Sequence, residues 1–257
     1  YGLGNATNKN FDSPTYTMHT DIGYLARLIY SYKDTYHFNA SFRRDGSSVF
    51  GNDNKWGNFP AFGAAWTISN EKWMENLKWI DNLKLKISWG KNGAQTLAPY
   101  GTLTTVSMGD SGGIANYYGG KIHYGQSITA LGNPLLGWQT TSAWNGGFET
   151  DLFGNKLHFE MNVYHSKTTD QIFDRTIPIM TAGISTQKAT MGQVNNTGVE
   201  INATSTNIKT KDFTWTSTFV FTLNRNKLVE LYGNGQNDIT NSLFVGKSLG
   251  AIYGYRT

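Results

Sequence analysis

The strongest constraint in the sequence is an alternation of apolar and polar residues with a period of two. In YHFNASFRRD, which starts at Tyr36, aromatic and small apolar residues alternate with His, Asn, Ser and Arg. This spacing indicates a β-strand with one apolar and one polar face. The same pattern recurs in LKLKISW (83–89), LHFEMNVYH (157–165) and FTWTSTFVFTLN (213–224), and more weakly at 22–32, 62–68, 144–152 and 199–204. We therefore predict an all-β fold with about eight or nine strands.

The segments between these strands alternate between short and long. Short links are expected at 33–35, 153–156 and 209–211, a medium one at 70–81, and long ones at 46–57, 92–137, 167–196 and 225–248. Several predicted strands reach about ten residues, which is enough to cross a bilayer at a tilt. Short turns at one rim and long loops at the other are typical of an antiparallel transmembrane β-barrel with long extracellular loops. A soluble β-sandwich is the alternative, because its strands alternate too.

The composition fits a surface that is only partly in contact with water. Charged residues make up 16% of the chain and aromatic residues 14%, whereas ordinary soluble domains contain about 25% charged residues. In a barrel, the apolar sides of the strands would face lipid and the polar sides a wet interior. The residues predicted to face that interior are His37, Asn39, Arg43, Lys84, Lys86, Glu149, Asp151, Glu160 and Glu200.

The sequence gives little support for catalysis or metal binding. The absence of cysteine excludes a thiol nucleophile, and the five histidines form no pair at helical spacing. Asp45 and Asp53 have the glycine and asparagine neighbours of turns rather than the spacing of a calcium loop. Glu149 and Asp151 share a predicted strand face, as the two acids of a glycosidase can. We interpret them instead as residues that line the interior wall of the barrel. We expect no enzymatic activity, no metal and no cofactor.

Charge and hydropathy narrow the choice of partners. The formal net charge of +4 comes from scattered Lys and Arg, so nucleic acid is not expected as a partner. The sequence has no run of about 18 apolar residues that would make a membrane-spanning helix. Its first residues, YGLGNATNKNF, lack the pattern of a signal peptide. We therefore expect either a processed chain or one that begins within a longer protein.

Two features lie outside the predicted strands. The segment EKWMENLKWIDNL (71–83) has apolar residues at helical spacing; we predict a short helical turn at a rim, with a partner-binding helix as the alternative. The long loops carry aromatic residues that would suit sugar stacking or protein contact, or that would pack on each other. These candidates are Tyr100, Tyr117, Tyr118, Tyr124 and Trp138.

Six blocks of the sequence, taken in order, resemble a known family. They are RRDGSSVFG (43–51), WGNFPAFGAAWTIS (56–69), WIDNLKLKISWGKNG (79–93), LGNPLLGWQTT (131–141), NNTGVEINA (195–203) and LNRNKLVEL (223–231). Together they resemble the barrel of SusC/RagA-like TonB-linked outer-membrane transporters, which are TonB-dependent receptors. The family-motif loop consists of Arg44, Asp45, Gly46, Ser47, Ser48, Phe50 and Gly51.

The resemblance implies a multi-pass barrel of roughly 22 strands in the cell outer membrane. It also implies an N-terminal plug, a TonB box, and a SusD-like surface lipoprotein that helps to capture glycans or peptides. Residues 1–257 would then be part of the barrel domain, without the plug. The resemblance thus predicts a component of an importer of oligosaccharides or peptides, with outer-membrane lipid as its surroundings and TonB engaged through a region missing from this chain.

Three functions remain as alternatives, and each makes a structural prediction. A transport component would be a partial barrel. A secreted β-rich carbohydrate-binding module would fold in water. A small self-contained outer-membrane barrel would pair its first strand with its last. The motif loop that follows Asp45 is predicted to pack against neighbouring loops at the extracellular rim.

Overall fold

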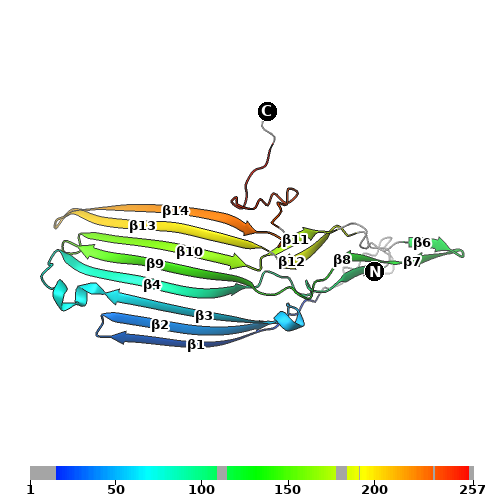
Figure 1. Cartoon of the computed structure of the whole chain (residues 1–257), viewed down its shortest axis with the longest axis horizontal. Helices are drawn as coiled ribbons and strands as arrows, with labels where there is room; N and C mark the ends of the chain where they lie inside the picture. Colours follow the sequence, from blue (N-terminus) through cyan, green and yellow to red (C-terminus); the bar gives the residue numbers. More distant parts are fainter. Residues whose placement is uncertain (1–15, 109–114, 178–183, 191, 234, 255–257) are drawn as a thin grey trace, which may run out of the picture.

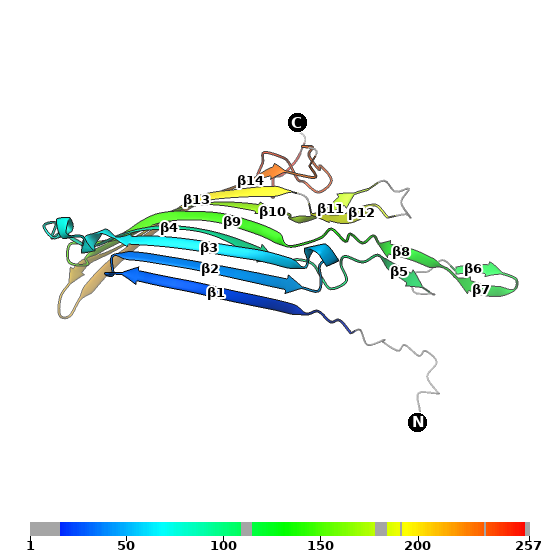
Figure 2. The ribbon, with the colours of Figure 1, turned by 60° about the horizontal axis from the view of Figure 1, so that its bottom comes forward.

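The computed structural model describes residues 16–108, 115–177, 184–190, 192–233 and 235–254. Its main feature is one antiparallel sheet of eight strands in which every strand pairs with the next one along the order of the sheet. The strands in that order are β1 (Asp21–Tyr32), β2 (Tyr36–Ser47), β3 (Trp56–Thr67), β4 (Ile80–Ala94), β9 (Gln139–Leu152), β10 (Leu157–Thr169), β13 (Gln193–Lys209) and β14 (Thr214–Glu230). Figure 1 shows these strands side by side, and Figure 2 shows that the sheet is curved.

The long strands confirm the predicted alternation. All eight segments with period two are strands of this sheet, and the strands have between 12 and 17 residues. At about 3.3 Å per residue even the shortest spans about 40 Å, which exceeds a hydrocarbon core of about 30 Å. No helix in the described part of the chain is long and apolar enough to span a membrane.

The short connections gather at one end of the sheet, which we call the turn end, and the long ones at the opposite loop end (Figure 1). The segment 71–83 lies at the turn end. Here the chain makes two 3-10 turns, η3 (Ile68–Asn70) and η4 (Lys72–Met74), before β4 begins. This agrees with a short turn at a rim rather than with a partner-binding helix. A third 3-10 turn, η2 (Asn52–Asn54), follows β2 at the loop end.

The long connections contain strands that the alternation did not reveal. The connection between β4 and β9 holds two hairpin pairs, and the connection between β10 and β13 holds one. These pairs are β5 (Thr105–Met108) with β8 (Gln126–Ala130), β6 (Ala115–Tyr118) with β7 (Lys121–Tyr124), and β11 (Ile172–Thr176) with β12 (Thr186–Thr190). Strands of four or five residues are too short to show a period.

The two faces of the large sheet differ sharply. On one side, here called the aromatic face, the register sets large apolar side chains across from each other, as with Phe62 and Trp89. Many of them are exposed, including Phe62 and Ile87 at 55% each. The other side, here called the polar face, carries charged and amide side chains such as Lys86, Glu149 and Asn162. An exposed apolar face of this size is unusual for a protein in water and indicates contact with lipid or protein.

The sheet does not close on itself. Within the described residues β1 and β14 are its two edges and do not pair with each other. The hypothesis of a small self-contained barrel is therefore wrong, because it requires exactly that pairing. The sheet instead has the form of one sector of a larger barrel, as predicted.

Candidate functional site

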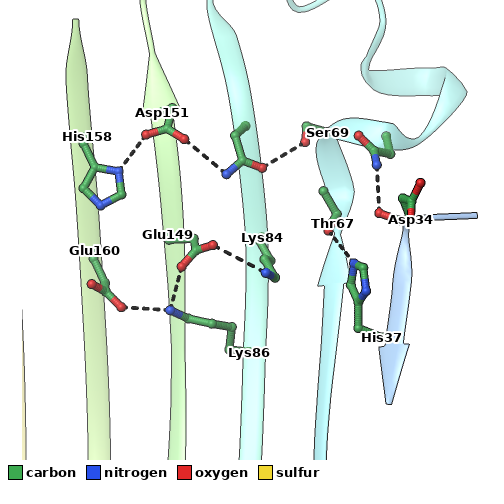
Figure 3. Close-up of polar contacts among 12 residues, drawn as sticks. Asp34, His37, Thr67, Ser69, Lys84, Lys86, Glu149, Asp151, His158 and Glu160 are labelled. Atoms are coloured by element: carbon green, nitrogen blue, oxygen red, sulfur yellow. Dashed lines mark hydrogen bonds and ion pairs between the residues drawn. The ribbon is translucent and has the colours of Figure 1, made fainter. Parts of the chain in front are cut away.

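The predicted interior residues all lie on the polar face of the sheet. Its central feature is a ladder of charges across β4, β9 and β10 (Figure 3). Lys86 Nζ donates to Glu149 Oε2 at 2.7 Å and to Glu160 Oε1 at 2.8 Å. Lys84 Nζ lies 3.6 Å from Glu149 Oε1. The register places the two carboxylates directly opposite each other, so Lys86 offsets a repulsion between like charges.

A second rung lies closer to the turn end. His158 Nδ1 contacts Asp151 Oδ1 at 2.6 Å, and Asp151 Oδ2 accepts from Asn82 Nδ2 at 3.2 Å (Figure 3). Ser69 Oγ continues the chain by donating to Asn82 Oδ1 at 3.4 Å. Asn82 is in phase with Lys84 and Lys86, but the predicted strand begins at Leu83 and does not include it; a bulge separates Asn82 from Ile80.

The remaining interior candidates lie away from this ladder. His37 contacts Ser31 Oγ and Thr67 Oγ1 at 2.9 and 3.1 Å. Asn39 lies opposite Gly63, and a Cβ at Gly63 would come within 2.7 Å of the Asn39 amide. Glu200 is exposed and lies opposite Asn162 and Thr222. The polar face thus joins Lys84, Lys86, Glu149 and Glu160 in one network and leaves the others separate.

Arg43 is the candidate nearest the loop end. Its Nε lies 2.7 Å from Asp45 Oδ2 and donates to Oδ1 of the same carboxylate at 2.8 Å. Gly23 on the neighbouring strand leaves room for this pair, because a Cβ there would lie 2.7 Å from Asp45 Oδ1. Asp45 is therefore a partner of arginine on the polar face.

The prediction of a loop from Arg44 onward is only partly right, because Arg44, Asp45, Gly46 and Ser47 pair within β2 and the loop begins at Ser48. This loop is built around a small buried core at the loop end. Val49 and Phe50 pack with Leu97 and Leu136, and Phe50 and Leu136 are 2% and 0% exposed. Trp138 covers this core, with its ring 4.9 Å from that of Phe50 and 5.5 Å from that of Phe59. The motif loop and the 133–138 segment therefore share one core, which confirms the predicted packing of this loop against a neighbouring loop.

Hydrogen bonds from side chains to backbone carbonyls hold the two segments together. Asn54 Nδ2 donates to the Leu135 carbonyl at 3.0 Å, and Trp138 Nε1 donates to the Lys55 carbonyl at 3.0 Å. Gly51 makes the closest approach: a Cβ at this position would lie 1.8 Å from the Pro134 carbonyl oxygen. Glycine is required here because no larger residue fits between the two backbones.

Two cavities open beside this core. One, of about 380 Å3, is lined mainly by polar groups and includes Asn58, Lys91 and Thr140. The other, of about 300 Å3, lies near Arg43 and Asp45. Trp138 borders both. Phe59 also belongs here: it is buried on the polar face opposite Arg43, a position that alternation alone does not give.

The other loop aromatics do not form a common site. Tyr100 lies in the connection after β4 and is exposed, whereas Tyr117 and Tyr118 lie on β6 and are 76% and 78% exposed. Tyr124 ends β7, and its side chain lies outside the described part of the structure. Among the described residues no group of three His, Asp or Glu side chains is arranged to hold a metal ion.

A second buried core lies at the other side of the loop end. Val194, Leu228 and Leu231 form it, and Phe173 and Tyr232 pack against it. Tyr232 Oη donates to Asp238 Oδ2 at 2.9 Å, and the Asn241 side chain donates to the same oxygen at 2.8 Å. Burial, together with the nearby Asp238 carboxylate, raises the pKa of Tyr232 to about 12.

Comparison with known families decides what this arrangement belongs to. Residues 1–256 match the family described as TonB dependent receptor-like, beta-barrel. The chain belongs to this family. The match spans the sheet, both loop-end cores and the hairpins between them.

Relatives within the TonB-dependent receptor family share sequence over most of this chain. TonB-dependent receptor P26 of Formosa agariphila is 34% identical over 236 residues, which cover 90% of this chain and 23% of the relative. TonB-dependent receptor SusC of Bacteroides thetaiotaomicron is 31% identical over 223 residues, which cover 86% of this chain and 22% of SusC. The chain thus spans about a quarter of the length of the curated relatives it matches.

The fold agrees with a solved TonB-dependent structure. The structure titled "Structure of the RagAB peptide transporter" superposes with a TM-score of 0.78 at 27% identity, covering 89% of this chain and 25% of the matched one. The SusC/RagA-like resemblance of the sequence blocks is therefore confirmed.

Proposed function

We propose that this chain is a sector of the barrel of a TonB-dependent importer, and that the whole protein carries oligosaccharides or peptides across the outer membrane. The observation that carries the proposal is the two-faced open sheet, with strands long enough to cross a bilayer. Its membership of the TonB-dependent family supports the same reading. The proposed activity is transport without bond breaking.

The two faces have distinct roles in this proposal. The aromatic face contacts lipid. Phe62 and Ile87, which the chain itself leaves exposed, would face hydrocarbon instead of water there. The polar face lines the interior, where Lys84, Lys86, Glu149 and Glu160 neutralise one another. Balanced charges suit an interior wall that contacts water and does not favour cargo of one charge sign.

The loop end would lie outside the cell in this arrangement. The core of Phe50, Leu97 and Leu136 gives the motif loop a fixed shape there. We propose that Tyr100, Tyr117 and Tyr118 contact cargo or a partner, because they are exposed on the long connections beyond the sheet. Trp138 has a different role as a packed residue at the rim of two cavities.

The remaining parts of the proposal concern the whole protein. A plug and a TonB-contacting segment would lie outside this chain, and a SusD-like lipoprotein would act at the loop end. The names of two relatives support this: one is SusC, and the other belongs to a RagAB complex titled a peptide transporter. Peptides and oligosaccharides are both retained as cargo.

The proposal is tested with the full-length protein in its own cells. We expect the protein to sediment with the outer membrane, to require detergent for extraction, and to co-purify with a surface lipoprotein. A strain that lacks the gene should lose growth on one class of cargo, either peptides or oligosaccharides, and recover it with the intact gene. A parent protein that is fully soluble and has no partner would refute the proposal and favour a secreted carbohydrate-binding module.

A further inference from the structure

A row of basic side chains crosses the aromatic face near the loop end. The register places Lys91 opposite Ser142, Ser142 opposite Lys167, Lys167 opposite Asn195 and Asn195 opposite Lys227, so one line runs across five strands. Arg225 lies on the same face two residues before Lys227. Arg44 lies on the same face of β2, opposite Tyr24 and Asn58. We call Arg44, Lys91, Lys167, Arg225 and Lys227 the cationic row.

The cationic row has no matching row of acids. The side chains of Asp21, Asp45, Glu149, Asp151, Glu160 and Glu200 belong to the opposite, polar face by the same register. Glu230, the last residue of β14, lies opposite Gln193 beyond a bulge and past the end of the row. Within the described residues, none of the five basic side chains forms an ion pair with a carboxylate. Asp170 lines the same polar cavity as Lys91 but forms no ion pair with it. Within the described residues, the row is therefore positive charge that no carboxylate pairs with.

Arg44 has the most defined geometry in the row. Its guanidinium carbon lies 5.1 Å from the centre of the Trp56 ring, which in turn stacks on Tyr24 at 6.2 Å. Gly46 makes room for the indole, since a Cβ there would lie 2.9 Å from the ring. Stacking on an aromatic ring orients the planar guanidinium and leaves its N–H donors free for a bidentate acceptor.

The neighbouring arginine shows what Arg44 lacks. Arg43 points to the polar face and is held by Asp45 at 2.7 Å. Arg44 points to the aromatic face, where it lies over the Trp56 ring and forms no ion pair within the described residues. Of the two consecutive arginines, Arg43 has a carboxylate partner and Arg44 does not. A substitution of Arg43 is therefore a matched control for a substitution of Arg44.

Aromatic and apolar groups lie directly below the cationic row, toward the turn end. Phe62, Trp89 and Trp144 form the adjacent register line. They border an apolar groove of about 610 Å3 that continues past Ile87 to Phe38. Aromatic residues of this kind mark the boundary between headgroups and hydrocarbon. A cation on the loop-end side of such a boundary lies at the depth of lipid phosphates. The groove on its turn-end side has room for an acyl chain.

We propose that the cationic row binds the phosphate groups of lipids in the leaflet at the loop end, with Arg44 as its most specific member. This inference rests on the proposed function, because it requires the aromatic face to be the lipid-facing side of a barrel. Arginine suits a phosphate because its two parallel N–H groups match two phosphate oxygens. The lysines extend the same attraction along the sheet as point charges.

The test uses the full-length protein, purified in detergent and titrated with dioleoyl phosphatidic acid while bound lipid is counted by native mass spectrometry. We expect Arg44→Ala to weaken lipid retention about fivefold, and the triple variant R44A/K91A/K167A to weaken it more than tenfold. Arg44→Lys should fall between wild type and Arg44→Ala. Arg43→Ala, on the polar face, should retain lipid as wild type does.

Two controls show whether the bound phosphate comes from a lipid or from free phosphate, and two outcomes distinguish failure of this inference from failure of the proposed function. Dioleoylglycerol, which has the same chains but no phosphate, should show no dependence on Arg44, and inorganic phosphate should not compete at equal concentration. Equal phosphatidic acid retention by wild type and the triple variant, with both proteins still in the outer membrane, would overturn this inference alone. A parent protein found outside the membrane would instead refute the proposed function.

Discussion

The middle of the sheet and its loop end are stabilised in different ways. At the loop end, Phe50 and Leu136 are buried among side chains of the chain itself. In the middle of the sheet, Phe62 and Ile87 are more than half exposed on the aromatic face, and the described strands have no buried layer beneath them. The loop end can thus keep its shape by its own packing, whereas the sheet depends on what surrounds it. In the proposed membrane setting, lipid takes the place of a protein core on one face.

The largest expected effect tests the loop-end core. Phe50→Ala removes a fully buried ring and should cost about 3–5 kcal/mol of local stability. Hydrogen exchange of the full-length protein should then show loss of protection in residues 48–55 and 133–138 together. Phe42→Ala, on β2 and exposed on the aromatic face, is the control. Similar losses in both variants would contradict the contrast between the two regions.

A slightly smaller effect tests the two faces of the sheet. Ile87→Lys places a charge on the aromatic face near its middle and should cost about 2–4 kcal/mol in lipid bilayers. Ser88→Lys, the next residue, points to the polar face and should be nearly neutral. Unfolding of the full-length protein by urea in lipid vesicles measures both. If Ser88→Lys proved the more costly of the two, the assignment of faces would be reversed.

The charge ladder should give a moderate effect. Lys86→Met leaves Glu149 and Glu160 facing each other without their shared cation. Because these side chains are partly exposed, we expect a loss of about 1–2 kcal/mol. Lys84→Met, which removes only the longer 3.6 Å contact, should cost less. The same urea titration measures it, and adding Glu149→Gln to Lys86→Met should restore part of the loss. An unchanged midpoint for Lys86→Met would show that the ladder does not contribute.

The smallest effect concerns the second core. Tyr232→Phe removes the hydrogen bond to Asp238 and should cost about 1 kcal/mol. Hydrogen exchange near Leu228 at neutral pH measures this, with Tyr117→Phe, an exposed tyrosine on β6, as the control. Protection that is identical in the wild type and Tyr232→Phe would show the bond to be dispensable.

The same pair predicts how pH affects this core. The pKa of Tyr232 is raised to about 12 from 10.0, so its contribution is complete below pH 10 and is lost as pH rises toward 12. For Asp238, burial opposes ionisation, but hydrogen bonds from Asn241 and Tyr232 outweigh it and lower the pKa. Its contribution is therefore present above the ordinary value of 3.8 and is lost as pH falls below it. Tyr232→Phe should abolish the alkaline loss and leave an acid one.

Local pattern was enough to predict the sheet but not the loop-end contacts. Period-two alternation placed His37, Lys86 and Glu160 on one face because each strand fixes the direction of its own side chains. It could not show which of them touch, since that depends on the register between strands. Trp138 was a candidate for exposed contact, yet it packs on Phe50 and Phe59. Such partners are brought together only by the folding of separate blocks.

The core shared by the motif loop and the 133–138 segment also constrains how the protein can change. Leu97 lies just after β4 and Leu136 just before β9. Because these two side chains pack together, the two ends of the long connection are held close to each other. Leu131 adds a bridge to Gln187 near the same point. When the ends of a flexible loop are already held together, doubling its length costs only about 0.6 kcal/mol of conformational entropy. Insertions and deletions between residues 98 and 130 should therefore leave the sheet folded, so the length of this stretch can change what the loop end contacts without changing the sheet.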